Sequence, residues 1–357
     1  MTPSDPAEAN ETIEIAGVRV APGERAVVRV PVAQRLVAGE VEIPGCIVHG
    51  RRPGPRLFVS AALHGDEING TEIVRRLLSL PILKRLRGTL VAVPVVNVYG
   101  FVAQERYLPD RRDLNRSFPG SPRGSLAARI AHTFLTTFVH GSTHGIDLHT
   151  GAIHRTNLPQ IRARLASPGV EAMARAFGTP VILNATLRPG SLRHSASEQG
   201  IPILVYEAGE ALRFDELSIR AGLRGILAVM RHLDMLPPGR PHRPAPSAVI
   251  SHHSVWVRAP ETGILSTRLR LGATIEKKAV LGTISDPLGQ SEKPIRSPVE
   301  GVLIGRTHLP LANEGDALFH IATFERLESV VEEVETFRED LELDPLEDEI
   351  TGLRGTA

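Results

Sequence analysis

The feature that most restricts the fold of this chain is an alternation of apolar runs and helical segments between residues 51 and 235. Continuous apolar runs such as PRLFVSAAL (55–63) and GTLVAVPVV (88–96) are typical of strands buried on both faces of a sheet. Between them, NGTEIVRRLLSL (69–80) repeats its apolar residues with the period of a helix. This alternation predicts an α/β domain with a largely parallel sheet and helices on both of its faces.

Further elements continue the alternation up to residue 233. The predicted helices are 125–139, 170–177 and 218–233, and the predicted strands are 144–150, 180–184 and 201–210. Before them, residues 1–50 hold short alternating runs separated by Gly and Pro, which predict a β-rich extension at the edge of the domain. After them, residues 236–248 contain five prolines and no apolar period, and are predicted to be a linker.

A short internal repeat lies beyond the linker. The segments VRAPETGIL (257–265) and IRSPVEGVL (295–303) carry Arg, Pro, Gly and Leu at the same positions, 38 residues apart. Two similar β units in succession predict a small pseudo-symmetric all-β domain over residues 249–324. Its two halves resemble the barrel-sandwich arrangement of lipoyl and biotinyl domains.

The formal net charge of +1 is unevenly distributed along the chain. In the acidic tail, residues 325–357, the segment 325–349 holds 12 acidic and 2 basic residues, a charge of −10, so the rest of the chain carries +11. The positive charge of the rest of the chain has two interpretations. It can attract an anionic, carboxylate-bearing substrate, or it can be scattered over a solvated surface. The tail is expected to be a solvated amphipathic helix or a flexible end. Aromatic residues make up only 4% and do not interleave with basic ones, so no nucleic-acid partner is predicted.

The chain lacks the marks of an exported or membrane protein. It begins MTPSDPAEANETIEI, without a basic start followed by an apolar stretch, and no run approaches the roughly 18 apolar residues of a membrane span. The single cysteine, Cys46, excludes an intrachain disulfide and is expected to be a small buried hydrophobe. We therefore expect a soluble cytoplasmic protein with no membrane partner, and leave open whether it forms a homo-oligomer.

Four polar side chains lie at or just after the carboxyl ends of predicted strands. In open α/β sheets, ligands bind at these ends. His64 and Glu67 follow the first strand of the alternation, His149 closes HGIDLHT, and Glu207 closes IPILVYE. Two imidazoles and a carboxylate suit Zn²⁺ and leave a fourth position for water. Asp147 lies two residues before His149, hence on the same face of its strand, where it can accept a hydrogen bond from the imidazole.

An arginine-rich loop, RYLPDRRDLNRSFPG (106–120), lies between these elements. Its polar residues of interest are Arg106, Arg111, Arg112, Asn115 and Arg116. Guanidinium groups beside an amide suit bidentate recognition of a carboxylate, although such a loop can also be a solvated surface. Weaker candidates for substrate contacts near predicted strand ends are His154, Arg155, Arg188 and Arg193.

Four motifs in this order carry a family resemblance. HGDE (64–67), DLNRSFPG (113–120), DLHTG (147–151) and YEAGE (206–210) resemble the succinylglutamate desuccinylase/aspartoacylase family, which is related to zinc carboxypeptidases. The resemblance covers roughly residues 55–323. It implies a carboxypeptidase-like α/β fold, with residues 51–235 as a zinc hydrolase domain, followed by a barrel-sandwich-like β domain.

The resemblance also implies roles for individual residues. His64, Glu67 and His149 would be the ligands of one zinc ion per chain, and Glu207 the general base. A substrate carboxylate would be held by Asn115 and Arg116. Independently of the resemblance, Arg112 in the arginine-rich loop and Arg193 near a predicted strand end are further substrate-binding candidates. Arg106 is the best match for the arginine that polarises the scissile carbonyl, with Arg111 or Arg112 as alternatives.

The implied function is a zinc-dependent deacylase that cleaves the amide bond of an N-acyl amino acid or a related small carboxylate-bearing amide. The chain departs from the family pattern in one feature that concerns the substrate. Aspartoacylases place a tyrosine of the C-terminal domain over the substrate, whereas the tyrosines here, Tyr99, Tyr107 and Tyr206, all precede that domain. Two alternatives remain: a zinc carboxypeptidase acting on peptides or cell-wall fragments, and a non-enzymatic carrier or binding module. A carrier needs a lysine at an exposed hairpin tip, and in SDPLGQSEKPI (285–295) the only lysine is Lys293.

Overall fold

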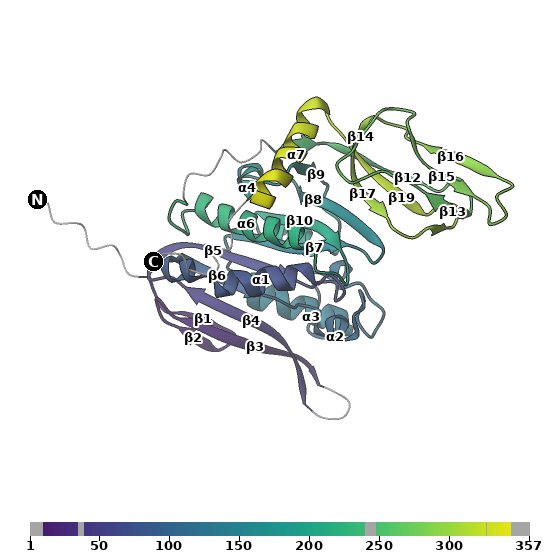
Figure 1. Cartoon of the computed structure of the whole chain (residues 1–357). Helices are drawn as coiled ribbons and strands as arrows, with labels where there is room; N and C mark the ends of the chain where they lie inside the picture. The colour runs from purple at the N-terminus through teal and green to yellow at the C-terminus, as the bar shows by residue number, and fades with distance from the viewer. Residues whose placement is uncertain (1–9, 35–38, 240–247, 326, 344–357) are drawn as a thin grey trace, which may run out of the picture.

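A computed structural model describes residues 10–34, 39–239, 248–325 and 327–343. Within them the chain forms one large mixed sheet, two smaller sheets and helices packed against the large one (Figure 1). The strands before residue 240 are β1 (Ile13–Ile15), β2 (Val18–Val20), β3 (Arg25–Gln34), β4 (Glu40–His49), β5 (Arg52–Ala61), β6 (Arg87–Val93), β7 (His144–Gly151), β8 (Arg155–Ala163), β9 (Val181–Asn184) and β10 (Ile203–Glu210). The α-helices are α1 (Asn69–Ser79), α2 (Val98–Ala103), α3 (Leu126–Phe134), α4 (Val170–Phe177), α5 (Leu192–Glu198), α6 (Glu216–His232) and α7 (Leu327–Leu343). Short helical turns are η1 (Pro81–Arg85), η2 (Leu114–Arg116) and η3 (Leu135–Val139).

The centre of the large sheet is parallel and its flanks are antiparallel. Strands β6, β5, β7 and β10 run parallel in that spatial order. On one side β4 and β3 add antiparallel strands, and on the other β8 returns antiparallel to β10. The predicted mixed, largely parallel α/β sheet is therefore confirmed at its centre.

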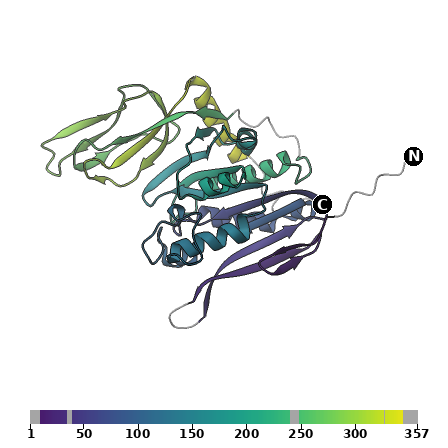
Figure 2. The same cartoon turned by 180° about the vertical axis from the view of Figure 1, so that it is seen from behind.

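Helices cover both faces of this sheet, as Figures 1 and 2 show from opposite sides. One apolar core lies between the sheet and the helices α1, α4 and α6, with Ile73 and Phe177 among its buried side chains. The other lies beneath α3, η3 and α5, with Phe134 and Phe138 buried there. Because both faces are covered, the central strands read in the sequence as continuous apolar runs instead of alternating ones.

The N-terminal segment extends the sheet edge instead of forming a unit of its own. β3 pairs with β4, and β4 pairs with β6 of the α/β domain. The small β1–β2 hairpin packs Ile15 and Val20 into the same core as α3. Cys46 is buried in β4, as expected for a small hydrophobe.

The C-terminal β region consists of β11 (Val249–Ser251), β12 (His253–Arg258), β13 (Gly263–Ser266), β14 (Thr274–Ile275), β15 (Val280–Ser285), β16 (Glu292–Arg296), β17 (Gly301–Thr307), β18 (Leu311–Ala312) and β19 (Ala317–Thr323). Strands β16, β15, β13 and β18 form one sheet, and β12, β19, β17 and β14 face it across a shared apolar core. Each copy of the repeat supplies the end of one strand and the beginning of the next, β12–β13 and β16–β17. Lys293 lies within β16, opposite Ile284, and pairs with Glu261, so it does not occupy a hairpin tip.

The β region is joined to the α/β domain by backbone hydrogen bonds. β17 pairs antiparallel with β8, with Gly305 opposite Asn157, so the large sheet continues from one part into the other. β11 pairs parallel with β9 of the α/β domain. Of the predicted linker, residues 240–247 lie outside the described residues, and Leu236 before them is buried.

The acidic segment forms α7 and packs on the protein. Val330, Val334, Phe337 and Leu341 are buried, and the Arg224 guanidinium lies 5.6 Å from the centre of the Phe337 ring. Among the described residues, no helix is long and apolar enough to cross a membrane.

Candidate active site

Three side chains converge on one point at the carboxyl ends of β5 and β7. β5 leads directly into the turn that carries His64 and Glu67, and His149 lies near the end of β7. The potential ligand atoms of these residues all lie within 4.8 Å of one another, and all three residues are buried. Parallel pairing of β5 with β7 brings the two segments together, although they are more than eighty residues apart in the sequence.

Glu67 stands between the two imidazoles. Its Oε1 lies 2.7 Å from His64 Nδ1 and its Oε2 lies 2.7 Å from His149 Nδ1. The backbone N–H of Thr150 also donates to Oε2, at 3.1 Å. Both rings therefore turn the same nitrogen, Nδ1, toward a shared carboxylate.

The other nitrogen of each ring is anchored by a second carboxylate. His149 Nε2 lies 2.8 Å from Asp147 Oδ2, and Asp147 Oδ1 accepts a hydrogen bond from Ser60 Oγ at 2.7 Å. His64 Nε2 lies 3.2 Å from Asp113 Oδ1. Carboxylates behind metal-binding imidazoles fix the ring orientation and increase its basicity, so this arrangement fits a metal held through Nδ1.

The charge balance of the group also fits a cation at its centre. Burial alone would raise the pKa of the Glu67 carboxyl, but His64 and His149 hold it well below its usual range. Burial likewise opposes protonation of His149, yet Asp147 and Glu67 raise its pKa well above its ordinary value. The carboxylates thus favour positive charge at this point, and a divalent ion can replace the protons that supply it.

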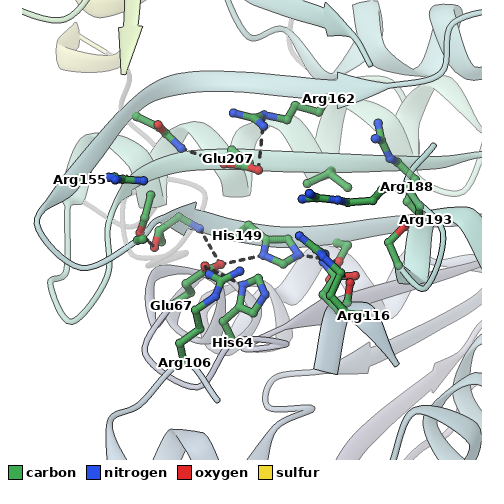
Figure 3. Close-up of a pocket in the computed structure, with 18 of the residues that line it drawn as sticks. His64, Glu67, Arg106, Arg116, His149, Arg155, Arg162, Arg188, Arg193 and Glu207 are labelled. Atoms are coloured by element: carbon green, nitrogen blue, oxygen red, sulfur yellow. Dashed lines mark hydrogen bonds and ion pairs between the residues drawn. The ribbon is translucent and has the colours of Figure 1, made fainter. Parts of the chain in front are cut away.

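Glu207 faces the same cavity from β10. In the parallel pairing of β10 with β7 it stands opposite His149. Its Oε2 accepts a hydrogen bond from Asn157 Nδ2 at 2.8 Å, and its Oε1 lies 3.4 Å from Arg162 Nε. Both partners come from β8, so Glu207 is held from the side away from the imidazoles, as Figure 3 shows.

Arg106 lies beside the group of His64, Glu67 and His149. One nitrogen, Nη1, lies 3.1 Å from Glu67 Oε1, and the other, Nη2, lies 3.2 Å from Asp113 Oδ2. The guanidinium is thereby fixed at the edge of the cavity. Arg112, by contrast, is not brought to the cavity: Arg111 has φ of +59°, and the exposed Arg112 side chain pairs with Asp110 at 3.7 Å.

The loop that carries Asn115 and Arg116 is braced against the segment before α5. Asn115 Oδ1 accepts a hydrogen bond from the Leu192 backbone N–H at 3.0 Å, which leaves its amide nitrogen as a donor. Gly190, with φ of +80°, approaches so closely that a Cβ there would lie 2.7 Å from the carbonyl oxygen of Arg116. Both Asn115 and Arg116 line the cavity.

The cavity has a volume of about 400 Å³, which is the size of a small-molecule site. Its wall includes nearly all residues predicted from the sequence as ligands, base or substrate contacts. These are His64, Glu67, Arg106, Asn115, Arg116, Asp147, His149, Arg155, Arg188, Arg193 and Glu207.

Sequence signals did not indicate the lining residues Asn157, Arg162 and Trp256. Asn157 and Arg162 lie on β8, whose sequence RTNLPQIRA has neither a continuous apolar run nor a clean alternation. Trp256, the only tryptophan of the chain, reaches the cavity from β12 of the β region. The Arg155 guanidinium lies 5.4 Å from its ring centre, and His320 stacks on it at 4.5 Å.

Residues 53–233 match the sequence pattern of the succinylglutamate desuccinylase/aspartoacylase catalytic domain. The chain belongs to this family. A curated relative, the N-alpha-acetyl-L-2,4-diaminobutyric acid deacetylase of Halomonas elongata, is 28% identical over 296 residues, which cover 80% of this chain and 86% of the relative. The family resemblance predicted from the four motifs is therefore confirmed.

Solved structures of other proteins share the fold. The succinylglutamate desuccinylase/aspartoacylase of Rhodobacter sphaeroides has a TM-score of 0.74 and 24% identity, and the match covers 84% of this chain and 96% of that one. The product-bound ectoine utilization protein EutE (DoeB) of Ruegeria pomeroyi has a TM-score of 0.76 and 23% identity over 90% of this chain and 98% of that one. Both matches extend well beyond the catalytic domain.

Proposed function

We propose that this protein is a zinc-dependent deacylase that hydrolyses the amide bond of a small N-acyl amino acid. The observation that carries the proposal is the convergence of a two-histidine, one-carboxylate group with Glu207 in a single cavity. Membership of a deacylase family and the curated deacetylase relative support acyl-amide hydrolysis.

His64, Glu67 and His149 would hold the metal, with Asp113 and Asp147 behind the imidazoles. When bound, zinc supplies Lewis-acid polarisation of the scissile carbonyl and lowers the pKa of a water molecule toward about 7. These two carboxylates keep both rings oriented.

Proton transfer is assigned to Glu207. Its carboxylate takes a proton from the attacking water and later delivers it to the leaving nitrogen. Asn157 and Arg162 hold the carboxylate in place. Arg106, fixed between Glu67 and Asp113, stabilises negative charge that develops on the carbonyl oxygen.

Substrate positioning is assigned to Asn115 and Arg116. The free amide nitrogen of Asn115 and the guanidinium of Arg116 together offer the planar donor set that a carboxylate accepts. A compact substrate fits the cavity volume of about 400 Å³, and Trp256 from the β region forms part of the wall.

A panel of amides tests this function. The zinc-loaded protein is incubated with N-acetyl and N-succinyl amino acids, with Nα-acetyl-L-2,4-diaminobutyrate, and with dipeptides and longer peptides, and the released amine is measured. We expect a small N-acyl amino acid to be cleaved best and a chelator to abolish the activity. Faster trimming of peptides from their C-termini would instead favour a carboxypeptidase, and inactivity on every amide would contradict the proposal.

A further inference from the structure

The last glutamate of the YEAGE motif, Glu210, has no part in the proposed reaction. It ends β10, where a bulge with Gly209 at φ of +72° separates it from Glu207. Its side chain is buried but does not line the cavity. Burying a carboxylate costs free energy unless its oxygens have partners, so the partners of Glu210 show what it holds.

The turn between β7 and β8 passes over the end of β10. Because β10 lies between these two strands in the sheet, the turn crosses about 10 Å, which is twice the spacing of neighbouring strands. Only residues 152–154 make this crossing. His154, the last of them, has φ of +61°, a left-handed conformation that is unfavourable for a residue with a Cβ. The turn therefore needs support from the residues around it.

Glu210 supplies part of that support from the end of β10. Its Oε1 accepts a hydrogen bond from the backbone N–H of His154 at 3.1 Å. Its Oε2 lies 3.9 Å from His308 Nε2, and the His308 backbone N–H donates to the His154 carbonyl at 2.7 Å. Both backbone polar groups of His154 are thus held, one by the carboxylate and the other by the β region.

Arg155, the residue after this turn, belongs to the cavity wall. Its backbone N–H donates to the Ala152 carbonyl at 2.9 Å, so its position follows that of the turn. Its guanidinium lies 5.4 Å from the centre of the Trp256 ring, and Figure 3 shows it on the side of the cavity opposite Arg188 and Arg193. Movement of the turn would displace this guanidinium and uncover the part of the tryptophan ring beneath it.

We propose that Glu210 is a positioning residue, which fixes the turn at His154 and thereby places Arg155 against Trp256 in the cavity wall. The inference rests on the proposed function and adds a residue that acts on substrate binding without touching the substrate. Because Glu207 is held by its own hydrogen bond to Asn157, loss of the Glu210 contact should weaken substrate binding and leave the chemical step unchanged.

Substitutions that separate side-chain length from charge test this role. Glu210→Gln keeps an oxygen that can accept from the His154 N–H but carries no charge, whereas Glu210→Asp keeps the charge on a side chain one methylene shorter. With an N-acyl amino acid that the protein hydrolyses, we expect KM to rise about tenfold in Glu210→Ala and in Glu210→Asp, with kcat changed by less than about twofold. Glu210→Gln should keep the KM of the unchanged protein. An unchanged KM in both Glu210→Ala and Glu210→Asp, a loss confined to kcat, or a Glu210→Gln protein as impaired as Glu210→Ala would overturn the proposal.

Arg213→Gln is the matched control. Arg213 Nε lies 3.5 Å from Glu210 Oε1, and its side chain is 70% exposed, so this ion pair contributes little. The substitution removes the ion pair and leaves the hydrogen bond to His154, so KM and kcat should stay unchanged. A rise in KM as large as that of Glu210→Ala would show that the ion pair, and not the hydrogen bond, matters.

The single tryptophan of the chain gives a readout that needs no substrate. Loss of the Arg155 contact should make the Trp256 ring more accessible to acrylamide, which quenches its fluorescence. Quenching should therefore increase in Glu210→Ala and in Arg155→Gln, and the double variant should not exceed Arg155→Gln, because both changes act on one contact. Glu210→Gln should be quenched like the unchanged protein. Unchanged quenching in Glu210→Ala, or additive increases in the double variant, would show that Glu210 does not act through Arg155.

The two proposals fail in different ways. If N-acyl amino acids are hydrolysed but Glu210→Ala changes neither KM nor the quenching of Trp256, the positioning role is wrong and the deacylase function stands. If no N-acyl amino acid is hydrolysed but the quenching follows the expected pattern, the proposed function is wrong and the placement of Arg155 and Trp256 by Glu210 stands.

Discussion

At the scale of single residues, the two carboxylates Glu67 and Glu207 have different neighbours. Glu67 is fully enclosed between two imidazoles and a backbone N–H, and nothing in this arrangement leaves it free to move a proton. Glu207 makes its hydrogen bond and ion pair with Asn157 and Arg162 at the cavity wall, not with an imidazole. Their different neighbours support the proposed roles of Glu67 in metal binding and of Glu207 in proton transfer.

Two matched substitutions test this division. Glu207→Gln keeps the shape and removes the basicity, so activity should fall by at least about a hundredfold while bound zinc remains at one per chain. Glu67→Gln removes a charged ligand, so zinc should be lost together with activity. Metal analysis of gel-filtered protein beside steady-state assays distinguishes the two. If Glu207→Gln lost zinc and Glu67→Gln kept it, Glu207 would be the metal ligand and Glu67 the general base.

At the scale of elements, β8 does most to complete the site. It lies between β10 and β17, contributes Asn157 and Arg162 to the surroundings of Glu207, and begins with Arg155. Arg155 lies against Trp256, and His320 stands opposite Trp256 in the β12–β19 pairing. The β region is therefore part of the cavity wall through one stack of side chains.

His320 is expected to make the free energy of unfolding of the protein dependent on pH. Its side chain is buried, with Nε2 2.9 Å from Ser254 Oγ, and burial together with the charge of Arg162 lowers its pKa from 6.5 to about 3. The unfolded chain then binds more protons between these two values, so this stabilisation is complete above pH 6.5 and declines as the pH falls toward 3.

The slope of that decline is the measurable quantity. From this residue alone, the free energy of unfolding should fall by about 1.4 kcal/mol per pH unit below its unfolded pKa. Denaturant titrations from pH 7 to pH 4 should show a shallower slope in His320→Gln than in the unchanged protein. Parallel slopes in the two proteins would show that His320 is protonated in the folded state.

At the scale of the whole molecule, the α/β and β parts share a sheet and a core. The β8–β17 pairing carries the hydrogen bonds, and a buried apolar cluster spans the junction. Its members are Leu158, Val181 and Leu183 from the α/β domain, Val302, Ile304 and Ala322 from the β region, and Val330 and Val334 from α7. Separate unfolding of either part would expose this cluster and an unpaired strand edge to water.

A single unfolding transition follows from this junction. Scanning calorimetry of the zinc-loaded protein should give one cooperative transition, because neither part keeps its buried surface without the other. Val302→Asp in the shared cluster should lower the temperature of that whole transition, whereas Leu288→Asp at an exposed loop position should leave it unchanged. Two resolved transitions, with only one moved by Val302→Asp, would contradict the shared core.

The sequence by itself determined the elements whose signals are local. Apolar runs of strand length marked β5, β6, β7 and β10 because both faces of the sheet are covered, and helical period marked α1, α4 and α6. The rule that ligands gather at the carboxyl ends of parallel strands then placed His64, Glu67, His149 and Glu207 at one edge. For these residues, chain order and strand direction were sufficient.

Only the tertiary structure decided which residues from other segments complete the cavity. Asn157 and Arg162 depend on the antiparallel return of β8, and Trp256 depends on the β17–β8 junction. Arg112 instead lies exposed and pairs with Asp110. The packing of α7 was also decided there, because its buried apolar side chains fill a surface formed by α6 and β17. Long-range pairing and packing set these positions, and no local period in the sequence records which distant strand a segment will meet.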